Sequence, residues 1–262
     1  MNSTELESTL QSLGLHYLAR HSADFCAMLT RKKLSPYETI EAIARLEQSE
    51  RTRRGAARRV NAAQLGRFAP LSDYDWTWPT KIDRDGIEDV MTMKFAEEPA
   101  NVILFGPAGV GKTMIAKNLA YQGALAGHSA LFTLASDMIS DLEQQDSPRM
   151  LRQRIARYVR PKILVIDEVG YLSYSNHAAD LLFQVLTRRH EKGSTIITTN
   201  LAFKDWGTIF PGAGCMSALI DRLTHRIEAF AIEGDSYRRK ESAERKQKKT
   251  KRNKKHDPEQ KS

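Results

Sequence analysis

The sequence predicts an α/β fold with a parallel sheet and a phosphate-binding loop, preceded by a small all-helical domain and followed by a disordered basic tail. The apolar run 102–105 leads into a glycine-rich loop and then a helical stretch, 114–120. The β-branched run 162–166 is typical of a strand buried on both faces of a parallel sheet. A length of 262 residues permits one sizeable α/β domain and a smaller appendage.

The first 66 residues are expected to be helical throughout. Apolar residues recur at helical spacing between residues 4 and 30. Ser35-Pro36-Tyr37-Glu38 predicts a capping box with proline at the first helical position, and the helix that it starts carries apolar residues on one face. We therefore assign residues 1–66 to an N-terminal domain that binds DNA or a partner protein.

Arginines gather at the end of this domain. The stretch 51–67 holds six arginines and no acid. Such a run favours contact with the phosphate backbone of DNA, and a merely solvated helix face is the alternative. The candidate DNA-binding residues here are Arg51, Arg53, Arg54, Arg58 and Arg59.

Residues 67–80 mix aromatic residues with prolines, which is typical of a linker lying across the face of the next domain. In proteins with a phosphate-binding loop, the segment just upstream often walls the adenine base. Trp76 and Trp78 are candidates for that wall, and plain hydrophobic anchoring of the linker is equally consistent with them. The second domain is assigned to residues 67–240.

The phosphate-binding loop is the first chemical motif. It consists of Gly106, Pro107, Ala108, Gly109, Val110, Gly111, Lys112 and Thr113. Glycines let consecutive backbone N–H groups surround an anion, and the helix that follows turns its positive dipole end toward the same charge. We expect Lys112 to reach the β- and γ-phosphates and the Thr113 hydroxyl to coordinate Mg²⁺. The loop therefore predicts binding of a nucleoside triphosphate.

Two acids end the second predicted strand. Asp167 and Glu168 follow the run 162–166, so they lie at the carboxyl end of the strand, where open α/β sheets bind ligands. We expect Asp167 to hold Mg²⁺ through water and Glu168 to orient and polarise the attacking water. Asn200 ends the next buried strand and is expected to position that water, with an ordinary cap as the alternative. The acids predict hydrolysis rather than binding alone.

A basic helix is expected over residues 148–160, between two prolines that begin and end it. Its apolar residues share one face and its arginines another. DNA contact and a solvated face remain equal alternatives for this second set of candidates, Arg149, Arg152, Arg154 and Arg157.

The helical stretch 219–226 offers an arginine for a shared active site. Arg222 or Arg226 is placed to reach the γ-phosphate of a neighbouring subunit, where it would neutralise charge in the transition state. A local ion pair with Asp221 or Glu228 is the alternative.

The net charge of +8 lies in the C-terminal tail. Residues 236–262 hold twelve Lys and Arg against four acids, while the rest of the chain is neutral. Residues 241–262 lack core-forming side chains and are expected to be disordered, contacting nucleic acid or only aiding solubility. Two distant cysteines, no metal-ligand spacing among the histidines and no apolar run of membrane-spanning length favour a cytoplasmic protein.

The order of the motifs resembles one known family. It runs Gly-Pro-Ala-Gly-Val-Gly-Lys-Thr, Leu-Val-Ile-Asp-Glu-Val-Gly-Tyr-Leu, Thr-Thr-Asn-Leu-Ala-Phe-Lys-Asp-Trp, Leu-Ile-Asp-Arg-Leu and Glu-Gly-Asp-Ser-Tyr-Arg. This order is similar to that of IstB-type helper ATPases of insertion sequences, which are AAA+ proteins close to the DnaC and DnaI helicase loaders. The resemblance covers about residues 70 to 239, and the N-terminus more loosely.

The resemblance implies ATP as the nucleotide, with Mg²⁺. It implies that Lys112 binds phosphate, that Thr113 and Asp167 hold the metal, and that Glu168 activates water. It also implies that Asn200 is the first sensor, Arg222 the arginine finger and Arg238 a second sensor. The paired helices at 136–160 match an additional helical insertion of this clade, which supports DNA contact by their arginines. The lysine-rich tail has no counterpart in the family pattern.

These inferences predict an ATP-dependent DNA-binding ATPase. It would assemble head to tail on duplex DNA, as a ring or a helical filament, and deliver target DNA to a transposase. The alternative with the same mechanism is a helicase loader that prefers single strands. Readings from other classes are a metabolic phosphotransferase and an architectural DNA-binding protein that holds ATP without hydrolysing it.

Overall fold

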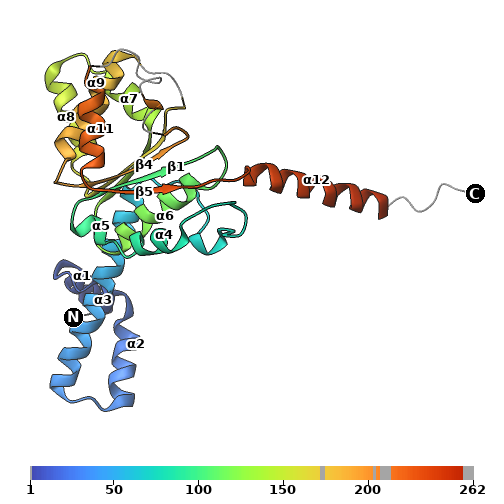
Figure 1. Ribbon diagram of the computed structural model, residues 1–262. Coiled ribbons are helices and arrows are strands. Elements are labelled where there is room, and N and C mark those ends of the chain that lie inside the picture. The colour runs from blue at the N-terminus through green and yellow to red at the C-terminus, as the bar shows by residue number, and fades with distance from the viewer. Residues whose placement is uncertain (1, 172–174, 203–204, 207–213, 256–262) are drawn as a thin grey trace, which may run out of the picture. The chain divides into compact units, whose positions relative to one another are not determined.

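The computed structural model describes residues 2–171, 175–202, 205–206 and 214–255 (Figure 1). The chain divides into two compact units, Met1–Arg58 and Arg59–Ser262. No helix in these described ranges is long and apolar enough to cross a membrane.

The first unit consists of helices α1 (Ser3–Ser12), α2 (His16–Lys32) and most of α3 (Pro36–Ala62). The predicted capping box forms at the start of α3: the Ser35 amide donates to the Glu38 carboxylate at 2.7 Å, and the Glu38 amide donates to the Ser35 hydroxyl at 3.3 Å. These bonds satisfy amides that a helix N-terminus leaves unpaired. The prediction of a helical N-terminal region is confirmed.

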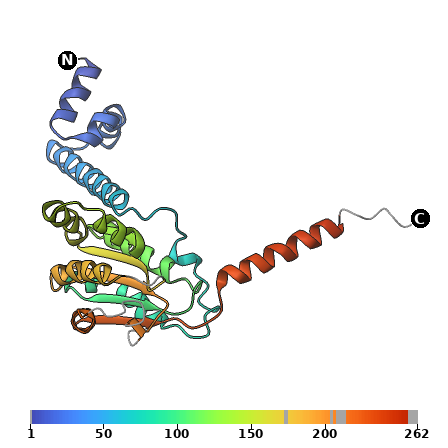
Figure 2. The same ribbon diagram turned by 90° about the horizontal axis from the view of Figure 1, so that it is seen from above.

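The second unit is built on a five-stranded parallel sheet with the order β2-β3-β4-β1-β5. Figure 2 shows these strands from a second direction. In chain order the strands are β1 (Asn101–Phe105), β2 (Ala130–Leu134), β3 (Ile163–Val169), β4 (Ser194–Thr199) and β5 (Ile227–Ala231). The prediction of a parallel-sheet α/β fold with a phosphate-binding loop is confirmed.

Helices cover both faces of the sheet (Figure 1). On one face lie the short helix η1 (Leu71–Asp73), α4 (Arg84–Val90), α5 (Lys94–Glu97) and α6 (Lys112–Leu125). On the other lie α7 (Ala135–Glu143), α8 (Pro148–Val159), α9 (Asn176–Arg189) and α11 (Met216–Thr224). Successive residues of a strand point to opposite faces. Val102 and Leu104 of β1 therefore join the first hydrophobic cluster, and Ile103 joins the second.

Arg189, at the end of α9, is a buried guanidinium that the sequence did not indicate. Its side chain lies in a residue only 1% exposed, and burial lowers its pKa to about 9. Its hydrogen bonds go to the hydroxyl of Thr195 and to the carbonyl groups of Tyr158, Val159, Pro161, Lys162 and Ser194. The guanidinium thus connects the end of α8 to the starts of β3 and β4. This is the amino end of the strands, whereas the phosphate-binding loop lies at their carboxyl end.

The C-terminal segment differs from the expected disordered tail. Helix α12 runs from Tyr237 to Lys255, and residues 256–262 lie outside the described ranges. Between its ends the sequence is made mostly of Lys, Arg, Glu and Gln, which favour helix, and it contains no Gly or Pro. Low hydrophobicity argued against a packed core, but it does not prevent a solvated helix.

Candidate nucleotide-binding site

A cavity of about 860 Å³ lies at the carboxyl ends of the central strands. It is lined by residues 107–113 of the loop together with Asp167, Glu168, Asn200 and Arg238. The structure therefore brings together residues that the sequence places more than a hundred positions apart. Arg222 is not among the lining residues.

The loop takes a backbone shape that requires glycine. Gly106, Gly109 and Gly111 have φ values of 151°, 87° and 103°, which L side chains rarely adopt. A Cβ on Gly106 would lie 2.0 Å from the Ile232 carbonyl oxygen, and one on Gly111 would lie 2.4 Å from the Tyr74 ring. Helix α6 begins at Lys112, within the last two residues of the loop, so the unpaired amides of its first turn face the cavity, where an anion is favoured.

Lys112 folds back over its own loop. Its ammonium donates to the carbonyl oxygens of Gly106 and Pro107, both at 2.7 Å. Burial, together with the charge of Arg238, lowers the pKa of this ammonium to about 8, although the charges of Asp167 and Glu168 oppose the shift. A polyanion in the cavity would add negative charge that stabilises this half-buried cation.

Asp167 is the centre of a hydrogen-bond network that joins three elements. Its residue is 2% exposed, and its Oδ1 accepts from the Thr113 hydroxyl at 3.0 Å and from the Thr198 hydroxyl. Thr198, in β4, also accepts the Glu168 amide at 2.9 Å. The sequence motifs did not single out Thr198, although a hydroxyl residue near the end of a buried strand, close to Asn200, is a signal for such a role.

Glu168 has an unusual backbone. Its φ is 62°, and the register between β3 and β4 shifts between Ile166 and Val169. A non-glycine residue in this left-handed region costs about 1–2 kcal/mol. Glu168 is exposed and lines the cavity, while Asp167 beside it is buried. The irregular backbone therefore gives two consecutive acids different environments.

The upstream linker forms one wall of the cavity. Tyr74 donates its hydroxyl to the Val110 carbonyl at 2.8 Å, and burial raises its pKa to about 12. Trp78 lines the cavity, as expected for the wall alternative. Trp76 instead packs against the core, with its ring 4.8 Å from that of Tyr74, so it acts as a hydrophobic anchor.

A second wall, joined to the linker, is the segment between β5 and α12. The Tyr237 amide donates to the Gly109 carbonyl at 3.0 Å, and the Trp78 indole donates to the Asp235 carbonyl at 2.8 Å. Arg238 is exposed in the first turn of α12 and lines the cavity, which is where the second sensor was predicted. Residues from both ends of the domain therefore meet around the loop.

Arg222 lies on α11 and contacts α9. Its Nη1 donates to the Thr187 hydroxyl at 2.8 Å, and its guanidinium lies 4.8 Å from the centre of the Phe183 ring. The alternative ion pair with Asp221 or Glu228 does not form among the described residues. The side chain is held by polar and ring contacts, and no carboxylate in the described part of the chain pairs with its charge.

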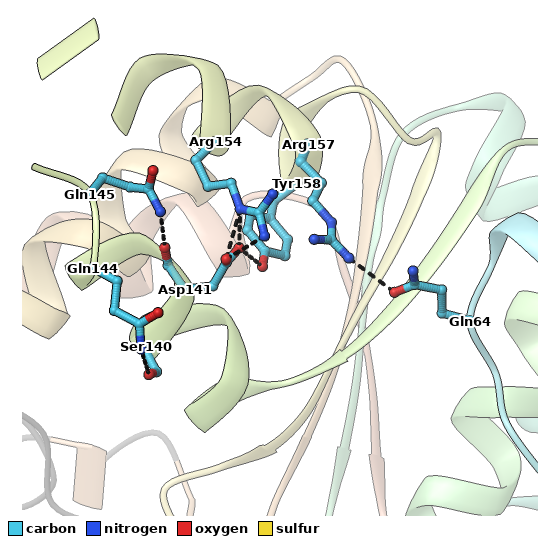
Figure 3. Close-up of polar contacts among 8 residues, drawn as sticks. All are labelled: Gln64, Ser140, Asp141, Gln144, Gln145, Arg154, Arg157 and Tyr158. Carbon is cyan, nitrogen blue, oxygen red and sulfur yellow. Dashed lines mark hydrogen bonds and ion pairs between the residues drawn. The ribbon is translucent and has the colours of Figure 1, made fainter. Parts of the chain in front are cut away.

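The arginines predicted on α8 fall into two groups. Arg154 donates through Nε to both carboxylate oxygens of Asp141, at 2.7 and 2.6 Å, and Arg157 donates to Gln64 at 3.1 Å (Figure 3). These two have structural partners within the domain. Arg149 and Arg152 are exposed.

The arginines of α3 divide in the same way. Arg53 makes two hydrogen bonds to Glu50, each 2.8 Å long, and Arg59 donates to the Ala124 carbonyl at 2.7 Å. Arg51 and Arg58 are exposed, and Arg54 is half-buried. The run 51–67 contains no acid, but Glu50, the residue just before that run, is the partner of Arg53.

Three potential metal ligands meet at the ends of α9 and α11. The ligand atoms of His190, Glu191 and His225 all lie within 4.8 Å of one another. No spacing in the sequence indicated this group, because the packing of two helices brings it together. It is separate from the residues that line the nucleotide cavity.

Known proteins resemble the chain along most of its length. It is 34% identical over 237 residues to the ATP-binding protein of insertion sequence IS21 from Pseudomonas aeruginosa, covering 90% of this chain and 89% of that protein. It is 30% identical over 237 residues to the ATP-binding protein of insertion sequence IS232 from Bacillus thuringiensis, covering 90% of this chain and 95% of that protein.

Solved structures share the fold of the second unit. The crystal structure of DnaI aligns with a TM-score of 0.52 at 18% identity, covering 63% of this chain and 90% of that one. At this identity the likeness shows the AAA+ fold. The model of the IstB-like ATP binding protein family matches residues 8–245. The chain therefore belongs to the IstB-like ATP binding protein family.

Proposed function

We propose that this protein is an ATP-dependent DNA-binding ATPase that assembles on duplex DNA and delivers target DNA to a transposase. The observation that carries the proposal is the separation between Arg222 and the cavity. Lys112, Asp167, Glu168 and Asn200 converge on one cavity, while the arginine predicted to complete the reaction lies on α11, outside its lining. A site divided in this way is completed by a neighbouring subunit.

The cavity residues suit ATP with Mg²⁺. The Thr113 hydroxyl and the Asp167 carboxylate are hard oxygen donors 3.0 Å apart, the donor type that Mg²⁺ prefers, and they would hold the ion. When bound, Mg²⁺ would supply positive charge that neutralises the phosphate oxygens. Lys112 would leave its loop carbonyls for the phosphates. Glu168, exposed in the cavity, would orient the attacking water together with Asn200.

Head-to-tail assembly follows from a finger that acts on the next subunit. Such contacts use two different surfaces, so they generate a ring or an open helical filament. Hydrolysis then depends on assembly, because only an assembled site contains an arginine from its neighbour. Assembly on DNA would thereby set how long the complex persists.

DNA contact is assigned to the exposed arginines rather than to all nine candidates. Arg149 and Arg152 on α8, and Arg51 and Arg58 on α3, remain available for phosphates. Arg154, Arg157, Arg53 and Arg59 already bond within the protein. Because phosphate contacts carry no base information, little sequence preference is expected.

Transposase delivery is supported by the family and by the insertion-sequence names of the two relatives. Electron microscopy of the protein on duplex DNA, with and without ATP, tests assembly. Salt-controlled affinities for duplex and single-stranded DNA distinguish the target-delivery protein from a helicase loader. Absence of ATP-dependent assembly on duplex DNA, or a preference for single strands, would contradict the proposal.

A further inference from the structure

The basic C-terminal helix α12 begins at the wall of the nucleotide cavity. Tyr237, Arg238 and Arg239, in the first turn of α12, are among the residues that line the cavity. Further along the same helix, residues 245–255 contain eight Lys and Arg and no acid. Most of this run lies beyond residue 245, where the match to the family ends. One helix thus combines a first turn at the cavity, residues 237–240, which we call the root, with a strongly charged extension, residues 245–255.

The root is fixed by contacts to the upstream linker and to the phosphate-binding loop. The Lys240 ammonium forms an ion pair with Asp75 of the upstream linker, at 3.0 Å, and lies 4.3 Å from the centre of the Trp78 ring. The Tyr237 amide donates to the carbonyl of Gly109 in the phosphate-binding loop. A nucleotide in this cavity would therefore contact the elements that hold the start of α12.

The charged extension fits a polyanion better than a protein core or a membrane. From Arg238 to Lys255 the only apolar residue is Ala243, so the helix has no hydrophobic face to bury. Eleven helical residues span roughly 16 Å. Duplex DNA carries one charge per about 1.7 Å of its axis, a density that matches such a run.

We propose that α12 is an arm that binds the DNA phosphate backbone. Nucleotide in the cavity controls the affinity of this arm for DNA through the contacts of Lys240 with Asp75 and Trp78. This rests on the nucleotide and DNA binding of the proposed function. Coupling between two binding sites is reciprocal. DNA on the arm must therefore change the affinity for nucleotide by the same factor by which nucleotide changes the affinity for DNA.

The binding role is tested by comparing the full chain with a chain that ends at Glu244. Affinity for duplex DNA is measured by fluorescence anisotropy between 50 and 200 mM salt, with and without a non-hydrolysable ATP analogue. If about four phosphates contact the arm, truncation lowers the steepness of log affinity against log salt by roughly 3 to 4. Unchanged affinity and steepness would overturn the arm. Equal displacement by polyglutamate would overturn its assignment to DNA.

The coupling is tested with Lys240→Gln. Lys81→Gln serves as the matched control because it removes another lysine ion pair near the same segment, the one with Glu233. In the full chain and in the control, duplex DNA shifts nucleotide affinity by at least about fivefold, the lower end of typical allosteric couplings. Lys240→Gln removes most of this shift while keeping most of the salt dependence. The same shift in the full and truncated chains would overturn the coupling.

The two proposals fail differently. If the truncated chain keeps DNA affinity, salt dependence and ATP-dependent assembly, the arm is wrong and the proposed function stands. If DNA binding depends on the arm but ATP induces no assembly on duplex DNA, the proposed function is wrong and the arm stands.

Discussion

The carboxylate of Asp167 and the hydroxyl of Thr198 are joined by a hydrogen bond that crosses from β3 to β4. The same carboxylate oxygen accepts the Thr113 hydroxyl, and Thr198 also accepts the amide of Glu168. One threonine therefore fixes both acids of the site relative to the phosphate-binding loop.

Replacement of Thr198 tests this positioning role. Thr198→Val keeps the shape but removes the hydroxyl, leaving the Glu168 amide and one side of Asp167 unpaired. We expect ATP turnover to fall by about tenfold or more, since misplaced groups of this kind cost roughly 10–100-fold. Steady-state phosphate release measures it, and Thr198→Ser, which keeps the hydroxyl, should restore most of the rate. Loss of nucleotide affinity alone, with normal turnover at saturation, would contradict the role.

Lys112 gives the site a pH dependence. Its pKa is lowered to about 8, and a bound triphosphate would stabilise the charged form. Nucleotide affinity should therefore fall as the pH rises above about 8. Without nucleotide, the unfolded chain binds more protons than the folded one between about pH 8 and the ordinary value of 10.5, so Lys112 alone makes stability rise with pH there.

Titration with a fluorescent ATP analogue from pH 7 to pH 9.5 measures this dependence. Lys112→Arg is the control, because arginine stays charged throughout this range. The control should bind with a flatter pH profile. A decline of equal steepness in both proteins would assign the titration to another group.

Glu168 separates stability from activity. Glu168→Gly should relieve the left-handed backbone and raise the free energy of unfolding by up to about 1 kcal/mol, while abolishing hydrolysis. Glu168→Gln keeps the backbone cost, so it should lose hydrolysis without gaining stability and remain on DNA in the ATP state. Denaturant unfolding and phosphate release measure the two effects. A glycine variant that is less stable than the wild type would argue against backbone strain.

Arg222 is expected to act on a neighbour. Arg222→Ala should abolish turnover and leave nucleotide binding largely intact, whereas Lys112→Ala should lose binding. Mixing the two inactive proteins should restore part of the activity, because some interfaces then combine an intact loop with an intact arginine. Arg226→Ala is the control on the same stretch. A mixture that stays inactive while the proteins still co-assemble would contradict a shared site.

The arginines of α8 should divide by their contacts. Arg154→Ala breaks the paired hydrogen bonds to Asp141 and should lower the free energy of unfolding by about 1–2 kcal/mol, the discounted value for a partly exposed charged pair. Arg152→Ala should change stability by less than about 0.5 kcal/mol and weaken DNA binding instead. Thermal unfolding and DNA anisotropy on both variants measure the contrast.

The sequence predicted well whatever depends on short spacing. The loop, the acids after β3, Asn200 after β4 and the capping box at Ser35 each carry a local signal, and the parallel sheet brings the strand ends together. Asp167 and Asn200 therefore met where the pattern placed them.

What the sequence did not predict depends on contacts between distant segments. Nothing local marks Arg189 as a buried cation, or pairs Arg154 with Asp141 across two helices. The tail was expected to be disordered because it lacks apolar residues, whereas residues of high helix propensity and contacts at its start favour the helix α12. Charge runs overstated the DNA-binding set, since a partner such as Glu50 can lie just outside the run.

The two ends of the parallel strands differ in how well their charged side chains are hydrogen-bonded. At the end of the sheet where β3 and β4 begin, the Arg189 guanidinium donates hydrogen bonds to carbonyl and hydroxyl oxygens of the same chain. These polar groups are therefore paired within the chain. At the end where these strands finish, the hydrogen bonds of Lys112 within the described part of the chain go to the carbonyls of its own loop. Heat should therefore loosen the protein first around the loop, and a ligand there should protect the half of the domain that the chain leaves unfinished.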